Sequence, residues 1–121
     1  MPDPILHPLL QRMLVDIQDP DTIYWVYANY FDIQPPTDRT TTRWWHAPLL
    51  FDYDSLWRAE FIDDGLLCDV ILKNQLPTER ERIKTPYSEI YRVTRFPKGG
   101  SVSEKDAQLF YDSAKFRTPI N

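Results

Sequence analysis

The sequence contains little cysteine, glycine or histidine, and each shortage excludes a class of site. Cysteine occurs once, at Cys68, so the chain cannot form an intrachain disulfide or a zinc site that needs two thiolates. Three glycines are too few for a Walker loop or a dinucleotide-binding fingerprint. The two histidines, His7 and His46, cannot supply a three-histidine metal site. No cofactor is expected from this composition.

Long apolar runs are also missing. None approaches the length of about 20 residues that a membrane-spanning helix needs, so no membrane association is expected. The first residues, Met1-Pro2-Asp3-Pro4, lack the basic and apolar regions of a secretory signal. With one thiol and no such signal, we expect a soluble protein in a reducing, cytoplasmic location. The sequence gives no indication of oligomeric state.

Length and charge set further bounds. The 121 residues, 42% of them hydrophobic, suit one domain, predicted over 1–121. Residues 1–75 carry 5 Lys/Arg and 12 Asp/Glu, whereas residues 76–121 carry 9 and 6, and the whole chain has a net charge of −4. Such asymmetry either polarises the surface toward a partner or disappears when folding brings distant charges together, and the second interpretation is the simpler one. A solvated face is the preferred interpretation of a run of basic residues between Arg80 and Lys98 that glutamates interrupt.

Eleven prolines divide the chain into intervals in which helices or strands can form. Apolar residues recur at helical spacing in 6–17 and predict an amphipathic helix. Asp19-Pro20 has the form of a helix start, so a short helix is preferred for 23–31 over the strand that its aromatic and β-branched residues favour. Pro35-Pro36 and the threonines after them predict a loop over 32–42.

The second half of the chain is predicted in the same way. Residues 49–76 are assigned to two helices that meet at Asp63-Asp64-Gly65, with a β-hairpin turning there as the alternative. A connector is predicted over 77–85, and 86–96 suits either a helix or a strand. A capping serine, Ser103, predicts a C-terminal helix over about 103–116.

These elements decide the predicted fold class. Three glycines and one Asp-Gly pair are too few turn residues for a sandwich or barrel of many short strands, so an all-β fold is excluded. We therefore predict a mainly α fold, a helix-rich small domain with room for one β-hairpin, and α+β is the alternative.

Aromatic residues are concentrated in the first half of the chain. Eleven of the seventeen fall between 24 and 61, around the run Arg43-Trp44-Trp45. Such residues either fill the core or supply the energy of a protein interface, because they bury a large area at low entropic cost. They could also stack nucleic-acid bases, but the acidic balance of the same region repels phosphate. Two adjacent tryptophans cannot face the same side of a helix or strand, so we expect at least one of them at the surface.

The predicted function is therefore the binding of another protein without catalysis, as an adaptor, accessory subunit or inhibitor in a larger assembly, and a viral or mobile-element origin of the chain fits these roles. Burial of aromatic side chains would drive that binding. The predicted partner-binding residues are Tyr27, Tyr30, Arg43, Trp44 and Trp45.

Two other functions stay open at this stage. A divalent-metal-dependent enzyme would use the carboxylates of Asp52, Asp54, Asp63 and Asp64, although aspartates also cap turns and helices. An acidic nucleic-acid mimic would occupy a DNA-binding surface, for which a net charge of −4 is mild.

A cysteine nucleophile with a histidine base is a weaker hypothesis. His46 would act as the base and Cys68 as the nucleophile. Cys68 lies among leucines and valine, where a lone cysteine behaves as a small core residue. His7, before Pro8, is expected at the surface.

Overall fold

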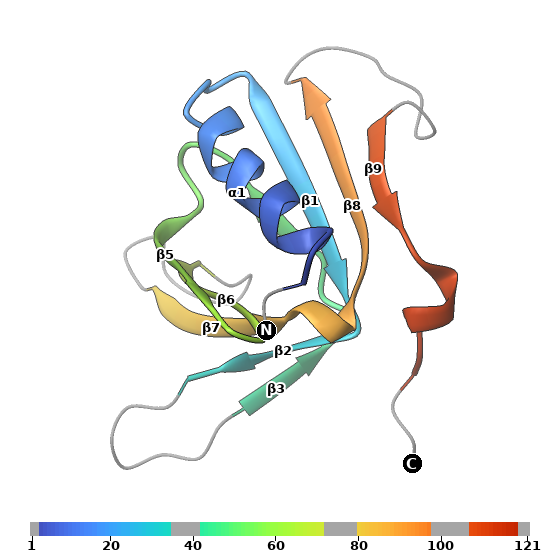
Figure 1. Ribbon diagram of the computed structural model, residues 1–121. Coiled ribbons are helices and arrows are strands. Elements are labelled where there is room, and N and C mark those ends of the chain that lie inside the picture. The colour runs from blue at the N-terminus through green and yellow to red at the C-terminus, as the bar shows by residue number, and fades with distance from the viewer. Residues whose placement is uncertain (1–2, 35–41, 72–79, 98–106, 119–121) are drawn as a thin grey trace.

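A computed structural model describes residues 3–34, 42–71, 80–97 and 107–118 (Figure 1). Within these ranges it contains one α-helix, nine β-strands and two 3₁₀ turns. The helix is α1 (Leu6–Asp16), and the 3₁₀ turns are η1 (Tyr87–Glu89) and η2 (Ser113–Lys115). The strands are β1 (Thr22–Ala28), β2 (Tyr30–Ile33), β3 (Thr42–Trp45), β4 (Leu49–Phe51), β5 (Trp57–Ile62), β6 (Gly65–Val70), β7 (Glu81–Pro86), β8 (Ile90–Pro97) and β9 (Gln108–Tyr111).

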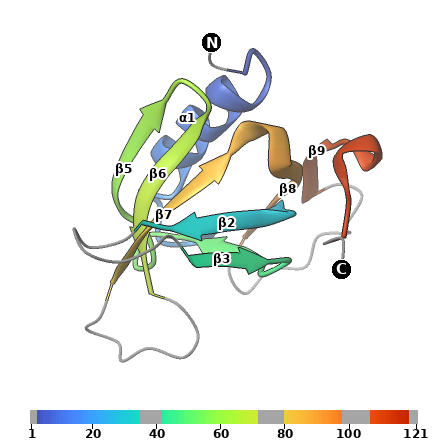
Figure 2. The ribbon, with the colours of Figure 1, turned by 90° about the horizontal axis from the view of Figure 1, so that it is seen from below.

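The strands form two antiparallel sheets. One has the order β4-β1-β8-β9 and the other has the order β3-β2-β7-β6-β5. The sheets are made from shared runs of chain, because β1 leads into β2, β3 leads into β4, and β7 leads through η1 into β8. Each of these three runs therefore contributes one strand to each sheet. Figure 2 shows β2 and β3 side by side, with β9 and the last turn of the chain beside one end of them.

The three runs pass from one sheet to the other at adjoining positions, which we call the bend. Asn29 separates β1 from β2, His46 follows β3, and η1 separates β7 from β8. The Asn29 amide N–H donates to the Glu89 carbonyl oxygen at 2.9 Å, and the His46 N–H donates to the Asn29 carbonyl oxygen at 2.9 Å. His46 has a φ of 54°, a left-handed conformation that turns the chain between β3 and β4. Main-chain hydrogen bonds thus join the three runs where they bend.

The core lies between the two sheets and α1. The predicted helix over 6–17 is confirmed, and its apolar face is buried through Leu6, Leu10, Met13 and Ile17. Both sheets contribute to the same core through buried side chains of β1, β2, β4, β6, β7 and β8: Tyr24, Val26, Ala28, Phe31, Leu49, Phe51, Leu66, Cys68, Val70, Ile83, Ile90 and Val93.

Side-chain contacts join α1 to both sheets. The Tyr24 hydroxyl on β1 donates to the Asp16 carboxylate. The His7 ring packs against Phe61 on β5 at 4.7 Å between centroids, and its Nδ1 lies 2.8 Å from the Tyr87 hydroxyl. His7 is therefore half-buried rather than a surface residue, and α1 lies between the β1–β8 pair and the β5–β6 hairpin (Figure 1).

The predicted mainly α fold class is wrong, because the structure is mostly β and the described residues contain a single α-helix. The exclusion of an all-β arrangement assumed that each strand needs its own glycine-containing turn. Here the three bent runs continue from sheet to sheet, so few tight turns are required. His46 supplies the one left-handed position among these bends without a glycine.

The short helix predicted for 23–31 is also wrong, because this segment forms most of β1 and the first half of β2. Asp19 does cap a turn: its carboxylate accepts a hydrogen bond from the Asp21 N–H at 2.9 Å. The Thr22 N–H bonds the Asp19 carbonyl oxygen at 3.1 Å, and the chain then becomes extended. Asp19-Pro20 therefore starts a turn, and the β propensity of the next nine residues decides their structure.

The two helices predicted in 49–76 are wrong as well. Residues 49–51 are β4, and Trp57–Ile62 and Gly65–Val70 are the hairpin β5–β6, so the alternative is confirmed. Asp63 and Asp64 form the turn, since Ile62 pairs with Gly65. At Gly65 an added Cβ would collide with the Thr85 carbonyl oxygen on β7, so only glycine permits this close approach of two strands.

Three further segments differ from prediction. The connector over 77–85 is wrong from Glu81 onward, where β7 begins, and residues 72–79 lie outside the described ranges. The loop over 32–42 is shorter than predicted, because Ile33 ends β2 and Thr42 begins β3, with 35–41 outside the described ranges. The helix over 103–116 is wrong from Gln108 onward, where pairing with β8 produces β9.

In the rest of that range, residues 103–106 lie outside the described part of the chain. Residues 86–96, left open between helix and strand, are η1 and most of β8. The described residues contain no helix long and apolar enough to cross a membrane.

Candidate functional site

The predicted partner-binding residues of the β2–β3 hairpin lie on its two opposite faces. Tyr30 pairs with Trp45, and Phe31 pairs with Trp44. Because successive side chains of a strand point to opposite faces, Phe31 and Trp44 face the core, where their rings stack at 6.0 Å. Tyr30 and Trp45 face outward, and their rings are 5.2 Å apart. The adjacent tryptophans therefore face opposite sides, as expected, but both are half-buried and neither is fully exposed.

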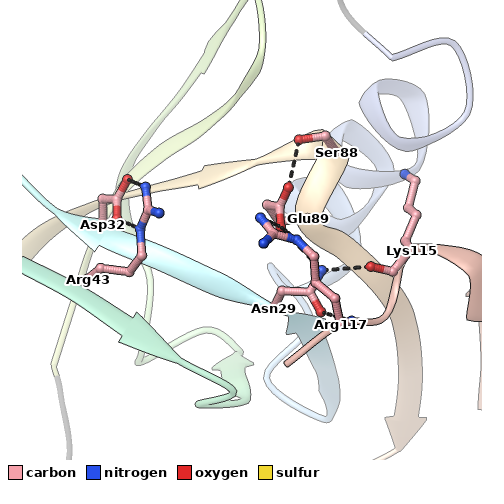
Figure 3. Close-up of polar contacts among 7 residues, drawn as sticks. All are labelled: Asn29, Asp32, Arg43, Ser88, Glu89, Lys115 and Arg117. Carbon is pink, nitrogen blue, oxygen red and sulfur yellow. Dashed lines mark hydrogen bonds and ion pairs between the residues drawn. The ribbon is translucent and has the colours of Figure 1, made fainter. Parts of the chain in front are cut away.

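Arg43 completes the outer face of this hairpin. Its guanidinium lies over the Tyr30 ring at 3.6 Å from the centroid. The same group donates two hydrogen bonds to the Asp32 carboxylate, at 2.8 and 3.2 Å (Figure 3). The hydrogen bond to Asp32 raises the pKa of Arg43 above its ordinary value, so the group stays charged. Arg43 is therefore fixed by a carboxylate on one side and an aromatic ring on the other.

Ring contacts continue from this hairpin across the bend. Trp45 contacts His46 at 6.1 Å between centroids, and His46 contacts Phe116 at 5.2 Å. Phe116 contacts Tyr91 at 5.1 Å, and Tyr91 contacts Tyr27 at 6.4 Å. We call this series the aromatic belt, and its members are Tyr27, Tyr30, Trp45, His46, Tyr91 and Phe116.

Two more arginines lie against the aromatic belt. The Arg117 guanidinium is 5.4 Å from the Trp45 ring centroid and 5.6 Å from that of Tyr30. The Arg92 guanidinium is 5.2 Å from the Tyr27 ring centroid. Burial raises the pKa of the Tyr91 hydroxyl, which stays neutral at physiological pH. Three guanidinium groups, those of Arg43, Arg92 and Arg117, thus lie against rings of the belt.

A buried polar cluster lies under the belt, at the bend. Asn29 is fully buried, and its side-chain amide donates to the Lys115 carbonyl oxygen at 2.8 Å and to Glu89 at 3.2 Å. The Asn29 side-chain oxygen accepts a hydrogen bond from the Arg117 main-chain N–H at 2.9 Å. Glu89, only 8% exposed, accepts from the Arg117 guanidinium at 2.9 and 3.1 Å and from the Ser88 hydroxyl at 3.2 Å (Figure 3). We call Asn29 and Glu89 the bend cradle.

The structure brings together four of the five predicted binding residues. Tyr27, Tyr30 and Trp45 belong to the aromatic belt, and Arg43 covers one end of it. Trp44 does not join them, because it packs against the core with Phe31.

Sequence reasoning missed Tyr91, Phe116 and Arg117 as neighbours of these residues. It also gave no role to the buried pair Asn29 and Glu89. The one available signal for this pair was that a carboxylate and an arginine can form an ion pair. Arg117 lies 28 positions after Glu89, and no motif or spacing in the sequence relates the two residues.

Trp44 has an apolar pocket beside it. The pocket has a volume of about 510 Å³ and is lined on one side by Trp25, Phe31 and Trp44. Leu49, Leu50 and Val70 are among the residues on the other side. Residues 72–79 follow directly and lie outside the described ranges, so no role is assigned to this pocket.

The four aspartates of the metal-site hypothesis do not form one cluster, and the carboxylates of Asp52 and Asp64 make separate contacts with other parts of the chain. Asp52 accepts a hydrogen bond from the Asp54 N–H at 3.0 Å and so stabilises the turn after β4. A hydrogen bond from Lys84, at 2.9 Å, holds the pKa of Asp64 below its ordinary value. Asp63 and Asp54 are exposed. In the described ranges, no group of three or more acidic, histidine or cysteine residues is arranged to hold a metal ion.

The Cys68 thiol is not suited to act as a nucleophile. Its side chain is fully buried in the core on β6. Burial raises the pKa of this thiol to about 12, so the thiolate is scarce at neutral pH. His46 instead packs between Trp45 and Phe116 in the aromatic belt.

Ion pairs join the acidic and basic halves of the chain. Arg82 pairs with Asp69 at 3.0 Å and with Glu60 at 3.2 Å, and Arg95 pairs with Asp16 at 3.4 Å. Arg82, Lys84 and Arg95, three basic residues of β7 and β8, are therefore neutralised locally. This arrangement agrees with the solvated face expected for them, of which Lys98 lies outside the described ranges.

Comparison with known proteins assigns no family. No protein-family model, curated protein or solved structure matches this chain. The function is therefore argued from the aromatic belt and the bend cradle.

Proposed function

We propose that this protein binds a partner protein through the aromatic belt and the three arginines beside it. The observation that supports the proposal is the unbroken series of ring contacts from Tyr27 to Tyr30, on the outer side of the chain. The rings come from β1, the β2–β3 hairpin, β8 and the C-terminal end. Other aromatic side chains, Phe31 and Trp44 among them, fill the core, so the belt residues are not needed for that purpose.

The chemistry of the belt suits a protein interface. Tyrosine, tryptophan and arginine carry most of the binding energy at such interfaces, because they bury a large area and lose little conformational freedom. Here each ring is already held by its neighbours, and Arg43 is held by Asp32. The cost of ordering these side chains is met on folding rather than on binding.

A protein partner is favoured over a nucleic acid. Affinity for nucleic acid comes mainly from cations that neutralise phosphates. Arg43 and Arg117 already pair with the carboxylates of Asp32 and Glu89. A phosphate would have to compete with both carboxylates, whereas an apolar or polar protein surface would not.

The other two hypotheses have no comparable support. The aspartates of the metal-dependent enzyme are spread over separate turns, as described above. A nucleic-acid mimic needs a row of free carboxylates, yet six carboxylates already have cationic partners: Asp16, Asp32, Glu60, Asp64, Asp69 and Glu89.

Affinity capture with variants of the full chain tests the proposal. Immobilised wild-type protein is compared with Trp45→Ala and Tyr30→Ala, and Tyr53→Ala serves as the control. Tyr53 is 55% exposed but lies on the turn after β4, outside the belt. A partner of the belt is retained by the wild type and the control and is lost from both belt variants.

The captured protein is then purified and its affinity is measured. Each belt substitution should weaken binding by about 30-fold or more, which corresponds to about 2 kcal/mol for an interface hot spot. Binding should change by less than about tenfold between 50 and 200 mM salt, unlike binding to phosphates. Equal affinity for wild type and Trp45→Ala would contradict the proposal, and so would a steep salt dependence.

A further inference from the structure

The C-terminal residues 112–118 lie in the bend cradle in the way that a bound peptide lies in its site (Figure 3). After η2 the chain passes over Asn29 and Glu89. The Asn29 side chain brackets it, donating to the Lys115 carbonyl oxygen and accepting from the Arg117 N–H. Both contacts are to main-chain atoms. Because this asparagine side chain hydrogen-bonds only a main-chain carbonyl and a main-chain N–H of the segment, it can bind an extended segment irrespective of the side chains of that segment.

Side-chain contacts give the cradle its selectivity. Glu89 accepts hydrogen bonds from the Arg117 guanidinium, while the rings of Tyr30 and Trp45 lie on another side of that group. The residue before the arginine, Phe116, contacts the rings of His46 and Tyr91. The arrangement therefore fits an aromatic residue followed by an arginine.

The segment itself is weakly anchored, in contrast to the cradle. None of the residues Ser113–Lys115 is buried, and Phe116 is 49% exposed. Asn29 is fully buried and Glu89 nearly so. Exposed segments held by polar contacts open most readily in a folded protein. When this one opens, the Asn29 side chain loses its hydrogen bonds to Lys115 and Arg117, and Glu89 loses its ion pair with Arg117, so both groups can accept a segment that offers the same partners.

We propose that the bend cradle binds an extended peptide segment in which an aromatic residue precedes an arginine, and that residues 112–118 occupy it until a partner supplies such a segment. The inference rests on the proposed function in one respect, namely that the partner is a protein. Beyond the proposed function, it identifies the peptide segment of the partner that is recognised and the segment of this chain, 112–118, that the partner replaces.

The test uses the full chain with its own segment weakened by the double substitution Phe116→Ala and Arg117→Ala. The probe is a fluorescent synthetic peptide with the sequence of residues 112–118, and binding is followed by fluorescence polarisation. We expect saturable binding to the double variant and at least about tenfold weaker binding to the wild type, whose cradle is occupied.

Matched substitutions show whether the cradle makes the contact. Adding Glu89→Gln to the double variant should weaken peptide binding by about tenfold or more, because a charge-assisted pair with arginine is lost. Glu60→Gln is the control, since Glu60 pairs with Arg82 on the β5 side and is 63% exposed. A peptide that keeps only the Phe-Arg pair and has glycine and serine elsewhere should still bind. A peptide with alanine in place of the arginine should not.

Absence of binding to a folded double variant would overturn the inference, as would binding that Glu89→Gln leaves unchanged. If the double variant does not fold, isotope-labelled wild type is titrated with excess unlabelled peptide, and the NMR signals of the Phe116 ring and the Arg117 N–H in its own segment are followed, because displacement removes both from their contacts. Failure of those signals to shift at saturating peptide would overturn the inference in the same way. These outcomes are distinguishable from failure of the proposed function, because the capture experiment compares Trp45→Ala and Tyr30→Ala in a chain whose residues 112–118 are unchanged.

Discussion

Trp44 and Trp45 are adjacent in the chain and both half-buried, yet the first stacks on Phe31 against the core and the second packs on Tyr30 on the opposite face of the hairpin. We therefore expect Trp44→Ala to reduce mainly the stability of the fold and Trp45→Ala to reduce mainly partner binding. Trp44→Ala should lower the free energy of unfolding by about 3 kcal/mol, because a large side chain leaves the core. Trp45→Ala should cost less, about 1 to 2 kcal/mol, because it removes ring contacts with Tyr30 and His46 but no core packing. Chemical denaturation of both variants measures the difference, and equal losses would contradict it.

Tyr24 should stay un-ionised in the folded protein up to strongly alkaline pH. Burial, together with the hydrogen bond to Asp16, raises the pKa of Tyr24 to about 12. Because the folded pKa lies above the unfolded value, the stabilisation is complete below pH 10 and is lost as pH rises toward 12. Ultraviolet titration of tyrosinate should show the delayed ionisation. Tyr24→Phe should remove it, at a cost of about 1 kcal/mol at pH 7, whereas Tyr53→Phe should not.

Cys68 should be inert to thiol reagents while the protein is folded. Burial raises the pKa of its thiol to about 12 and also blocks access to it. A colorimetric disulfide reagent at pH 8 should therefore react only as fast as the protein opens, and rapidly after denaturation. Fast reaction of the native protein would show that β6 is accessible and would restore the cysteine hypothesis.

Gly65→Ala should destabilise the hairpin β5–β6 strongly. A methyl group at this position would collide with the Thr85 carbonyl oxygen and press against the main chain of Pro86. Since the main chain of a paired strand cannot yield as a side chain does, we expect a loss of about 2 kcal/mol or more. Thermal unfolding of the variant measures it. Asp63→Ala, in the exposed part of the same turn, should change stability by less than about 0.5 kcal/mol.

Local patterns in the sequence were sufficient for some elements. The apolar spacing of 6–17 predicts α1, and Asp63-Asp64-Gly65 marks the β5–β6 turn. In 23–31 the cap signal at Asp19 conflicted with β propensity, and propensity determined the structure. In 103–116 the amphipathic pattern was outweighed by pairing of Gln108–Tyr111 with β8, a contact that local spacing does not encode.

The candidate site was predictable only in part. Tyr27, Tyr30, Arg43 and Trp45 were found because they are rings and an arginine close together in the chain. Asn29 and Glu89 were not found, since they are 60 positions apart and each is ordinary by itself. Their role appears only when the bend places them together beneath Arg117.

The three runs of chain that pass from sheet to sheet have a consequence for how the molecule comes apart. An edge strand such as β5 or β9 can fray alone, because each pairs with a single neighbour. Melting one sheet alone would instead expose the core that both sheets share and would break the main-chain hydrogen bonds that join the three runs at Asn29, His46 and η1. Heat or denaturant should therefore dissolve both sheets in a single transition, with no half-melted species between the native and unfolded chain.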